Sequence, residues 1–572
     1  MPFSPLDYIV IAGYVVLLIV VAFIAKKRGQ KSLDDYFAGG KDLPWWLVGV
    51  SMVATTFAAD TPLAITGIVA SQGIAGNWFW WSWMISGLLT VFVYAKLWKR
   101  ADVLTDCEFI ELRYGGKPAS FLRGFRALYF AFPFNCVIMG WVTVGMAKVM
   151  SVLTGASQWE IIIVLYGMTA VYIAISGLWG VVVTDFIQFF IAMIGSIALA
   201  YFSVDHIGGF GALKTELSQI GSLDILSLNP FNNPEIPIIT ALIWVGMAWW
   251  AAWYPGAEPG GGGYIAQRMF SAKDERNAVG ATLLFNITNY ALRPWPWILV
   301  ALVSLIVFPD LIDKEAGYPM VMAEVLPVGW FGLMCVAFLS AFVSTISTQL
   351  NWGTSYVIND FYARFIKKES KFDSKEAAQK HYVLISRLAT IGMAGIAIIV
   401  SYFFDSVKGG WEFILSLSAG IGGVMLLRWF WWRINAWSEI TAMIAALIGA
   451  IISKVFEIEI MDSAFAGSMI FTTIFSTASW LIATFSTKPE TKETLEKYFT
   501  QVRPMGKGWK KFSKGKVSNE RILPILSNVT FSLMAILFFL FGMSDLFFGD
   551  FIKGLSFLIG GCLATWIIVK KI

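Results

Sequence analysis

A run of hydroxyl side chains lies inside an apolar segment between Ser340 and Thr348. Residues three and four apart share one face of a helix, and here those residues are Ala341, Ser344, Thr345, Ser347 and Thr348. Hydroxyl and carbonyl oxygens are the atoms that replace the water shell of a small hard cation. The same stripe also suits close helix packing, with each hydroxyl bonded to a carbonyl one turn earlier. The segment therefore predicts either a cation site or a tightly packed helix.

Two other apolar segments are interrupted where a regular helix cannot continue. One contains Asp60-Thr61-Pro62 near its middle, and the other ends its apolar run at Tyr254-Pro255, ahead of glycines 260–263. Lipid cannot bond to the freed backbone groups, so such breaks occur only where they line a cavity or are buried in protein. Both breaks predict a binding site within the membrane. An alternative for the second break is a simple helix end followed by a glycine linker. The glycine run lacks the Lys-Ser/Thr ending of a phosphate-binding loop, so ATP is not implied.

Charged residues deep within the predicted membrane spans are few, and those with a candidate role are Asp60, Lys148, Asp185 and Arg293. Each costs roughly 2.5 to 3.5 kcal/mol at the centre of a bilayer unless it is paired or hydrated. A structural ion pair between Asp60 and Arg293 is one explanation. The other is that these side chains bind a ligand or an ion.

Aromatic residues crowd the same regions. Trp253 and Tyr254 precede the second break, and with Asp60 they could hold an ammonium group by charge and ring face. Arg293 could receive a carboxylate in a bidentate contact. A zwitterionic or otherwise amino-containing solute is therefore one hypothesis. For a further cluster, comprising Trp78, Trp80, Trp81 and Trp83, an aromatic belt at the outer membrane surface is an equally good explanation.

The elements that must position these residues are membrane helices. Of the 572 residues, 57% are apolar and only 14% are charged, against about 25% charged in soluble domains. This composition excludes a soluble enzyme, and two histidines with four scattered cysteines offer no metal or redox site. About fifteen apolar runs are long enough to cross; they span 6–25, 45–72, 78–98, 124–154, 158–176, 179–205, 235–256, 279–308, 328–361, 382–404, 409–432, 436–457, 464–486, 522–543 and 549–569.

The positive charges indicate how these helices are oriented. Most of the 43 Lys and Arg residues fall in connections on one side of the membrane if residue 1 lies outside. Basic loops stay in the cytoplasm, which predicts an N-terminus outside and a C-terminus inside. The only long hydrophilic connection, 487–521, is rich in lysine and is predicted to contact the inner leaflet.

The two helix breaks lie five spans apart, so they open two five-helix units of opposite orientation, as in inverted-repeat transporters. The predicted units are an extra helix and loop (1–44), a first repeat (45–232), a second repeat (233–434) and peripheral helices (435–572). The fold class is thus an all-α polytopic membrane protein with a 5+5 inverted-repeat core.

Four motifs carry a resemblance to a known family, and they are the segments 32–40 (SLDDYFAGG), 179–188 (WGVVVTDFIQ), 267–268 (QR) and 359–362 (NDFY). Together they make residues 1 to about 460 similar to the sodium:solute symporter family, whose fold resembles that of the leucine transporter. The resemblance implies a main sodium site made of the backbone carbonyls of Ala54, Phe57 and Ala341 and the hydroxyls of Ser344 and Thr345. It also implies a second site, present in some members, at Asp185, Ser344, Ser347 and Thr348.

The resemblance is less specific about the solute. Asp60 matches an acidic residue of the proline-carrying members, and Tyr264 matches the tyrosine that closes the inner side of the site in sugar carriers. The asparagine that binds sugar in those carriers is Gly262 here, and their lysine falls at Asn289, so a plain glucose-type site is not expected. The predicted solute-lining residues are Asp60, Thr61, Trp253, Tyr254, Glu258 and Arg293.

These observations predict a sodium-coupled symporter in the cell membrane that imports a small polar solute by alternating access. Its partners would be the solute, Na⁺ and the lipid bilayer, with no ATP, no nucleic acid and no enzymatic reaction. A sodium/sugar or sodium/carboxylate symporter of the same fold is an alternative. A proton-coupled carrier is another, because Asp60 or Asp185 could titrate.

Overall fold

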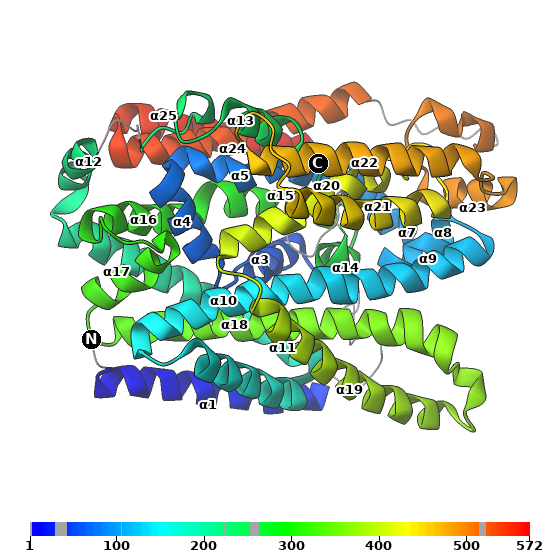
Figure 1. The fold of residues 1–572 in the computed structure, drawn as a ribbon, viewed down its shortest axis with the longest axis horizontal. Coiled ribbons are helices and arrows are strands. Elements are labelled where there is room, and N and C mark those ends of the chain that lie inside the picture. Colours follow the sequence, from blue (N-terminus) through cyan, green and yellow to red (C-terminus); the bar gives the residue numbers. More distant parts are fainter. Residues whose placement is uncertain are drawn as a thin grey trace.

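The computed structural model describes residues 3–28, 43–103, 106–220, 225–251, 262–513 and 522–571. Helices account for all regular structure in these ranges, apart from two isolated bridges that join Leu43 to Ala272 and Ile460 to Ser463. Most long helices run side by side along one axis, with α1 on one flank and the pair α24 and α25 on the other (Figure 1). This arrangement confirms the predicted all-α class.

The first half of the chain forms the following elements: α1 (Pro5–Arg28), α3 (Trp45–Thr55), α4 (Thr61–Gln72), η2 (Ile74–Asn77), α5 (Trp78–Trp81), α6 (Trp83–Leu89), η3 (Thr90–Tyr94), α7 (Ala95–Ala101), α8 (Asp106–Arg113), α9 (Gly116–Tyr129), η4 (Phe130–Phe134), α10 (Asn135–Thr154), α11 (Gln158–His206) and α12 (Gly209–Gln219).

The second half continues with η5 (Pro230–Asn232), α13 (Ile238–Gly246), η6 (Ala248–Trp250), α14 (Gly263–Ser271), α15 (Glu275–Ile287), η7 (Thr288–Leu292), α16 (Trp295–Val307), η8 (Lys314–Ala316), α17 (Gly317–Val325), α18 (Trp330–Ser355), η9 (Tyr356–Ile366), η10 (Glu369–Lys371), α19 (Lys375–Ser401), α20 (Val407–Leu427), α21 (Ala436–Val455), α22 (Ala464–Ser486), α23 (Lys492–Val502), η11 (Lys507–Phe512), α24 (Ile522–Phe548) and α25 (Phe551–Lys571).

Within the described residues, eleven helical stretches are long and apolar enough to cross a membrane. Further predicted crossings correspond to the apolar helix α1 and to the interrupted pair α3 and α4. The figure of fifteen crossings stays a prediction, as do the repeat boundaries at 45–232 and 233–434.

The first predicted break is confirmed. Helix α3 ends at Thr55 and α4 begins at Thr61, with residues 56–60 outside any helix. Pro62 occupies the first turn of α4, where its missing N–H costs nothing because that group has no partner within the helix. Proline therefore starts the second half-helix here.

Helix α11 differs from the two separate spans predicted at 158–176 and 179–205, because the helical assignment continues through Gln158–His206. The helix is not straight, however. Tyr166 packs against Phe342 with ring centroids 6.1 Å apart, while Gln188 and Ala192 line a cavity with the adjacent Ala341. A straight helix would separate residues 166 and 188 by about 33 Å. Helix α11 therefore folds back between these contacts.

The second predicted break lies between α13 and α14. Helix α13 ends at Gly246, a short 3-10 turn follows at Ala248–Trp250, and α14 begins at Gly263. Trp253, Tyr254 and Glu258 lie outside the described residues. Tyr264 is the second residue of α14, and the structure describes its backbone only.

Two helix pairs cover the core at the C-terminal end of the chain. Glycines let the helices of each pair approach closely: a Cβ at Gly449 of α21 would lie 3.3 Å from Thr472 of α22, and one at Gly542 of α24 would lie 2.9 Å from Leu558 of α25. Small residues at such crossings are typical of membrane helices, which lack a hydrophobic driving force for association.

The predicted basic connection forms α23 and η11 over its described part. Its apolar residues Tyr498, Val502 and Trp509 are buried, and Trp509 donates its indole N–H to the carbonyl of Trp429 at 3.1 Å. The segment is thus packed against the protein, and lysines such as Lys492 remain exposed. An additional contact of these lysines with the inner leaflet stays a prediction.

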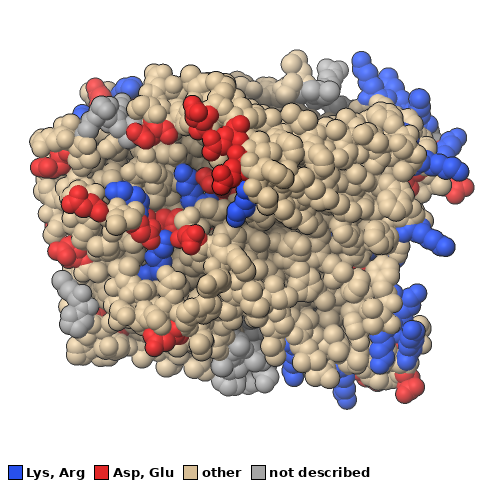
Figure 2. Space-filling view, in the orientation of Figure 1, with Lys and Arg blue, Asp and Glu red and all other residues tan. Residues whose placement is uncertain are grey.

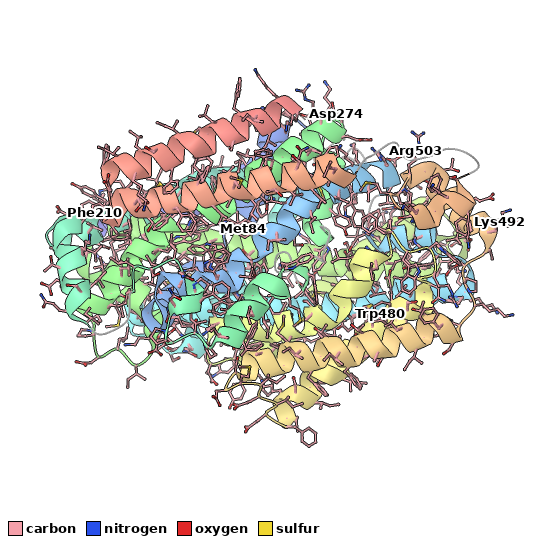
Figure 3. All side chains as sticks on the ribbon, turned by 90° about the horizontal axis from the view of Figure 1, so that it is seen from above. Met84, Phe210, Asp274, Trp480, Lys492 and Arg503 are labelled. Atoms are coloured by element: carbon pink, nitrogen blue, oxygen red, sulfur yellow. The ribbon has the colours of Figure 1, made fainter. Side chains whose placement is uncertain are left out.

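Charge is separated along the long axis of the molecule. Lys and Arg gather at the end that carries Lys492 and Arg503, acidic residues with some basic ones among them lie toward the opposite end, and a broad uncharged band lies between (Figures 2 and 3). The N-terminus lies at the acidic end (Figure 1). This distribution is the one expected if the basic end faces the cytoplasm.

Candidate ion and solute site

Two cavities flank the break between α3 and α4. The small cavity has an empty volume of about 210 Å³ and the large cavity one of about 530 Å³, including their open mouths. Both are bounded by the broken segment and by α18. The residues of the hydroxyl stripe therefore face two compartments.

The small cavity contains most of the predicted main sodium site. Its lining consists of Ala54, Phe57, Gln188, Phe189, Ala192, Ala341 and Ser344. Four of the five predicted residues meet there, although the positions around 54–57 and 341–344 are nearly 300 residues apart in the chain. The fifth residue, Thr345, lines the large cavity instead.

Two of the four predicted sodium-site hydroxyls on α18 have no hydrogen-bond partner. Thr345 Oγ1 and Thr348 Oγ1 are buried without one, whereas Ser347 Oγ donates to the Ser344 carbonyl at 3.0 Å. Helix packing therefore accounts for Ser347 but not for the two threonines, since a buried polar group without a partner is costly. Of the second predicted sodium site, Asp185 lies on α11, where the structure describes its backbone only.

Gln188 is a site residue that the sequence analysis missed. Its Nε2 donates to the Tyr14 hydroxyl at 2.7 Å, which leaves Oε1 buried without a partner beside the small cavity. Gln188 lies three residues after Asp185, one helical turn away. An amide at this spacing in an apolar span was the signal that could have identified it.

The large cavity has charged and aromatic walls. Asp60, Thr61, Asn289 and Arg293 line it together with four tryptophans, namely Trp80, Trp83, Trp141 and Trp411. All four tryptophans are at most 5% exposed. The outer-belt explanation is therefore wrong for Trp80 and Trp83, because tertiary packing turns both residues into the core.

Asp60 is held at one wall of the large cavity. It is 3% exposed, and its Oδ2 accepts a hydrogen bond from Trp411 Nε1 at 3.1 Å. Its Oδ1 accepts no hydrogen bond of normal geometry. Helix α10 approaches closely because residue 145 is glycine: a Cβ there would lie 3.0 Å from Asp60 Cα.

Arg293 occupies another part of the lining and holds the broken segment. Its Nη1 donates to the Val53 carbonyl at 3.1 Å and to Thr56 Oγ1 at 2.8 Å. The guanidinium also lies over the Trp297 ring, 5.1 Å from its centroid. The preceding π-helical turn η7 carries Asn289 into the cavity lining. Asp60 thus bonds to Trp411 on α20, whereas Arg293 bonds to Val53 on α3 and to Thr56 just after it.

Lys148, the fourth charge predicted within the membrane, is a structural ion pair. Its Nζ lies 2.7 Å from Glu315 Oε2 and 2.8 Å from Asp313 Oδ2. Glu315 also accepts the backbone N–H groups of Val407 and Lys408 at the start of α20. This cluster joins α10, η8 and α20.

A second buried charge network lies at the basic end and was not predicted. Asp106 Oδ2 accepts from Arg126 Nη2 at 3.1 Å and from the backbone N–H of Gly263 at 3.4 Å. Asp106 Oδ1 also accepts from the Tyr356 hydroxyl, and Arg126 lies 3.6 Å from Glu439. The network joins α8, α9, η9 and α21 to the first turn of α14, next to Tyr264.

Comparison with known proteins decides the family. Residues 36–449 match the sequence profile described as the sodium:solute symporter family. The chain belongs to this family. The sodium/glucose cotransporter of Vibrio parahaemolyticus is 26% identical, over 83% of this chain and 89% of the relative. Sodium/glucose cotransporter 1 of Oryctolagus cuniculus is 24% identical, over 75% of this chain and 69% of the relative.

The fold is also shared with a solved structure, the substrate-bound outward-open state of a Na⁺-coupled sialic acid symporter. The TM-score is 0.66 at 19% identity, and the match covers 86% of this chain and 99% of that one. This likeness confirms the predicted leucine-transporter-like fold class. The symporter is accordingly a multi-pass membrane transporter with sodium as its coupling ion, and it is not an enzyme.

Proposed function

We propose that the protein imports a small zwitterionic or other amino-containing solute across the cell membrane together with sodium. The observation that carries the proposal is the pair of cavities on the two sides of one helix break, one lined by uncharged oxygens and the other by charges and rings. Sodium would bind in the small cavity and the solute in the large one.

The proposed main sodium ligands are the carbonyls of Ala54, Phe57 and Ala341 with the hydroxyls of Ser344 and Thr345. The buried Gln188 Oε1, which has no hydrogen-bond partner, is proposed as a further oxygen beside them. All are neutral oxygens, which suit a monovalent hard cation. Asp185, Ser347 and Thr348 remain the proposed additions for a second ion, and the unpartnered Thr348 hydroxyl supports that assignment.

Coupling follows from the shared break. An ion held between residues 54–57 and α18 would fix the segment that also carries Asp60, so the loaded protein would bind solute more tightly. By linkage, the solute would tighten sodium binding by the same factor. One ion moving down about 100 mV and a tenfold gradient releases about 3.7 kcal/mol, enough for several-hundredfold accumulation.

The solute assignment is supported by opposite charges in one cavity. Asp60 would hold an ammonium group and Arg293 would attract a carboxylate, with Thr61 between the broken segment and the solute. Trp253, Tyr254 and Glu258 stay in the proposed lining because they follow the 3-10 turn that ends at Trp250. Tyr264 is the proposed inner gate, next to the residue that Asp106 holds.

A sugar is the second candidate solute, because the relatives named above are sodium/glucose cotransporters. Against it, Gly262 and Asn289 replace the two sugar-associated positions noted in the sequence. A proton-coupled cycle through Asp60 is the alternative for the ion.

The test uses the purified full chain in proteoliposomes. Uptake of labelled amino acids, betaines, carboxylates and sugars is measured with sodium outside, and again with potassium outside at the same pH and membrane potential. We expect accumulation of an amino-containing solute in sodium only. Equal accumulation in potassium would contradict the sodium assignment, and accumulation of a sugar alone would contradict the solute assignment.

A further inference from the structure

Resting on the proposed function, we infer that the large cavity selects a fully methylated ammonium group, so that the solute is a quaternary ammonium compound of the betaine class rather than a free amine. The feature that carries this inference is the juxtaposition of four tryptophans with a buried carboxylate that retains an unused oxygen.

The aromatic walls come from four separate elements. Trp80 lies on α5, Trp83 on α6, Trp141 on α10 and Trp411 on α20, and all line the cavity that contains Asp60. Trp83 and Trp411 are neighbouring walls, with ring centroids 6.2 Å apart. Indole has the ring face that attracts cations most strongly. We call these four residues the tryptophan cage.

The cage is supported from behind. Phe79 stacks on Trp411 with centroids 6.3 Å apart and ring planes 8° apart, and Tyr290 stacks on Trp80 at 5.8 Å. Helix α20 can approach Trp141 only because residue 410 is glycine, where a Cβ would lie 2.8 Å from Trp141 Cβ and 3.0 Å from its indole ring. The walls are therefore fixed before a ligand arrives, which lowers the entropic cost of binding.

Asp60 provides the charge of the cage. Trp411 Nε1 holds Oδ2, and Trp141 also approaches the carboxylate, but Oδ1 lacks a hydrogen bond of normal geometry although it is buried. A buried carboxylate that is only partly satisfied costs free energy that a cation in the cavity would recover.

Ring faces discriminate between free and methylated amines. A primary ammonium has three N–H donors that each need an acceptor. The four cage walls offer indole rings with Asp60 as the acceptor among them, and the unpartnered oxygens of Thr345 and Gln349 in the same lining belong to α18. A trimethylammonium group has no donor to satisfy, and its methyl groups carry the positive charge onto the rings. The oxygens of Thr56 and Asn289 lie with Arg293, whose charge suits the carboxylate end.

The test is a ligand series that changes only the methylation of nitrogen: glycine, sarcosine, dimethylglycine and glycine betaine. Binding to the purified full chain is measured by calorimetry in sodium chloride and in potassium chloride. In sodium we expect affinity to rise along the series, with betaine at least about tenfold tighter than glycine. Glycine binding as tightly as betaine would overturn the inference. It would also be overturned if neither betaine nor tetramethylammonium bound in either salt.

A neutral isostere separates charge from shape. In 3,3-dimethylbutyrate a carbon replaces the betaine nitrogen, so the size is kept and the positive charge is lost. We expect at least about tenfold weaker binding than for betaine. Equal binding would show that the cage recognises apolar bulk alone and would overturn the inference.

Variants of one wall identify the ring as the cause. Trp83→Phe keeps a ring and should change betaine affinity by less than about threefold, whereas Trp83→Leu should weaken it about tenfold. Trp480→Phe, on peripheral α22, is the matched control. If Trp83→Leu bound betaine normally, the cage would be wrong.

Sodium-driven uptake of a different solute would refute the cage but leave the proposed symport intact, whereas loss of all sodium dependence would refute the proposed symport itself.

Discussion

The two cavities share a wall but differ in every property that decides what they bind. The small cavity is lined by backbone and neutral side-chain oxygens with apolar neighbours, whereas the large cavity contains Asp60, Arg293 and the tryptophan cage. Neighbouring residues on α18 line different cavities, because Ser344 lines the small cavity and Thr345 the large one. An ion and a solute can thus influence each other through one helix turn.

The difference between the cavities also explains which binding site family membership can predict. Sodium has one size and one chemistry, so a site for it needs only a fixed set of oxygens. Solutes differ in charge and shape, so a shared fold does not by itself specify the solute. Membership of the family therefore determines the coupling ion and leaves the solute to the particular side chains of this chain.

The largest expected effect comes from removing the charge of the large cavity. Asp60→Asn keeps the shape of the side chain, and we expect solute affinity to fall by about 100-fold, since a buried charge pair loses one partner. Sodium affinity in the absence of solute should change much less. Both affinities are measured by calorimetry, and an equal loss of both would show that Asp60 belongs to the ion site.

A smaller effect is expected from the hydroxyls of α18. Ser344→Ala and Thr345→Ala should each raise the sodium concentration for half-maximal uptake about tenfold, because each removes one oxygen from a charged ligand. Ser355→Ala on the same helix is the matched control, as its hydroxyl donates to the Trp352 carbonyl. Unchanged sodium dependence in both test variants would remove α18 from the ion site.

Gln188 lines the small cavity, and only the tertiary structure identified it as a site residue. Gln188→Leu deletes the unpartnered oxygen, and we expect about three- to tenfold weaker sodium binding with no change in relative solute preference. Tyr14→Phe, which removes only the group that holds the amide, should have a lesser effect in the same direction. A shift in solute preference with normal sodium affinity would place Gln188 in the solute site instead of the ion site.

The smallest effect is expected from a change in the spacing between α10 and the backbone of Asp60, which removes no binding group. Gly145→Ala adds a Cβ 3.0 Å from Asp60 Cα, and relief of this contact should lower solute affinity about threefold, because an overpacked site shifts its neighbours. Gly392→Ala on α19 has open space around it and is the control. Solute and sodium titrations of both variants decide whether the effect is confined to the large cavity.

The sequence by itself determined the features that local patterns encode. Hydropathy indicated membrane helices, Pro62 with Asp60 marked the break confirmed between α3 and α4, and the spacing of Ser344 and Thr345 placed them on one helix. These signals depend on residues a few positions apart, where backbone chemistry and helix periodicity act directly. The motifs likewise led to the correct family.

Only the tertiary structure decided which faces meet. Trp411 reaches Asp60 from more than 300 residues away, Gln188 joins the small cavity because α11 folds back, and Trp80 and Trp83 turn inward instead of forming an outer belt. In a chain this apolar, the hydrophobic pattern cannot distinguish a lipid-facing side from a buried one. The composition of the solute cavity therefore depends on packing between distant helices, which no local pattern records.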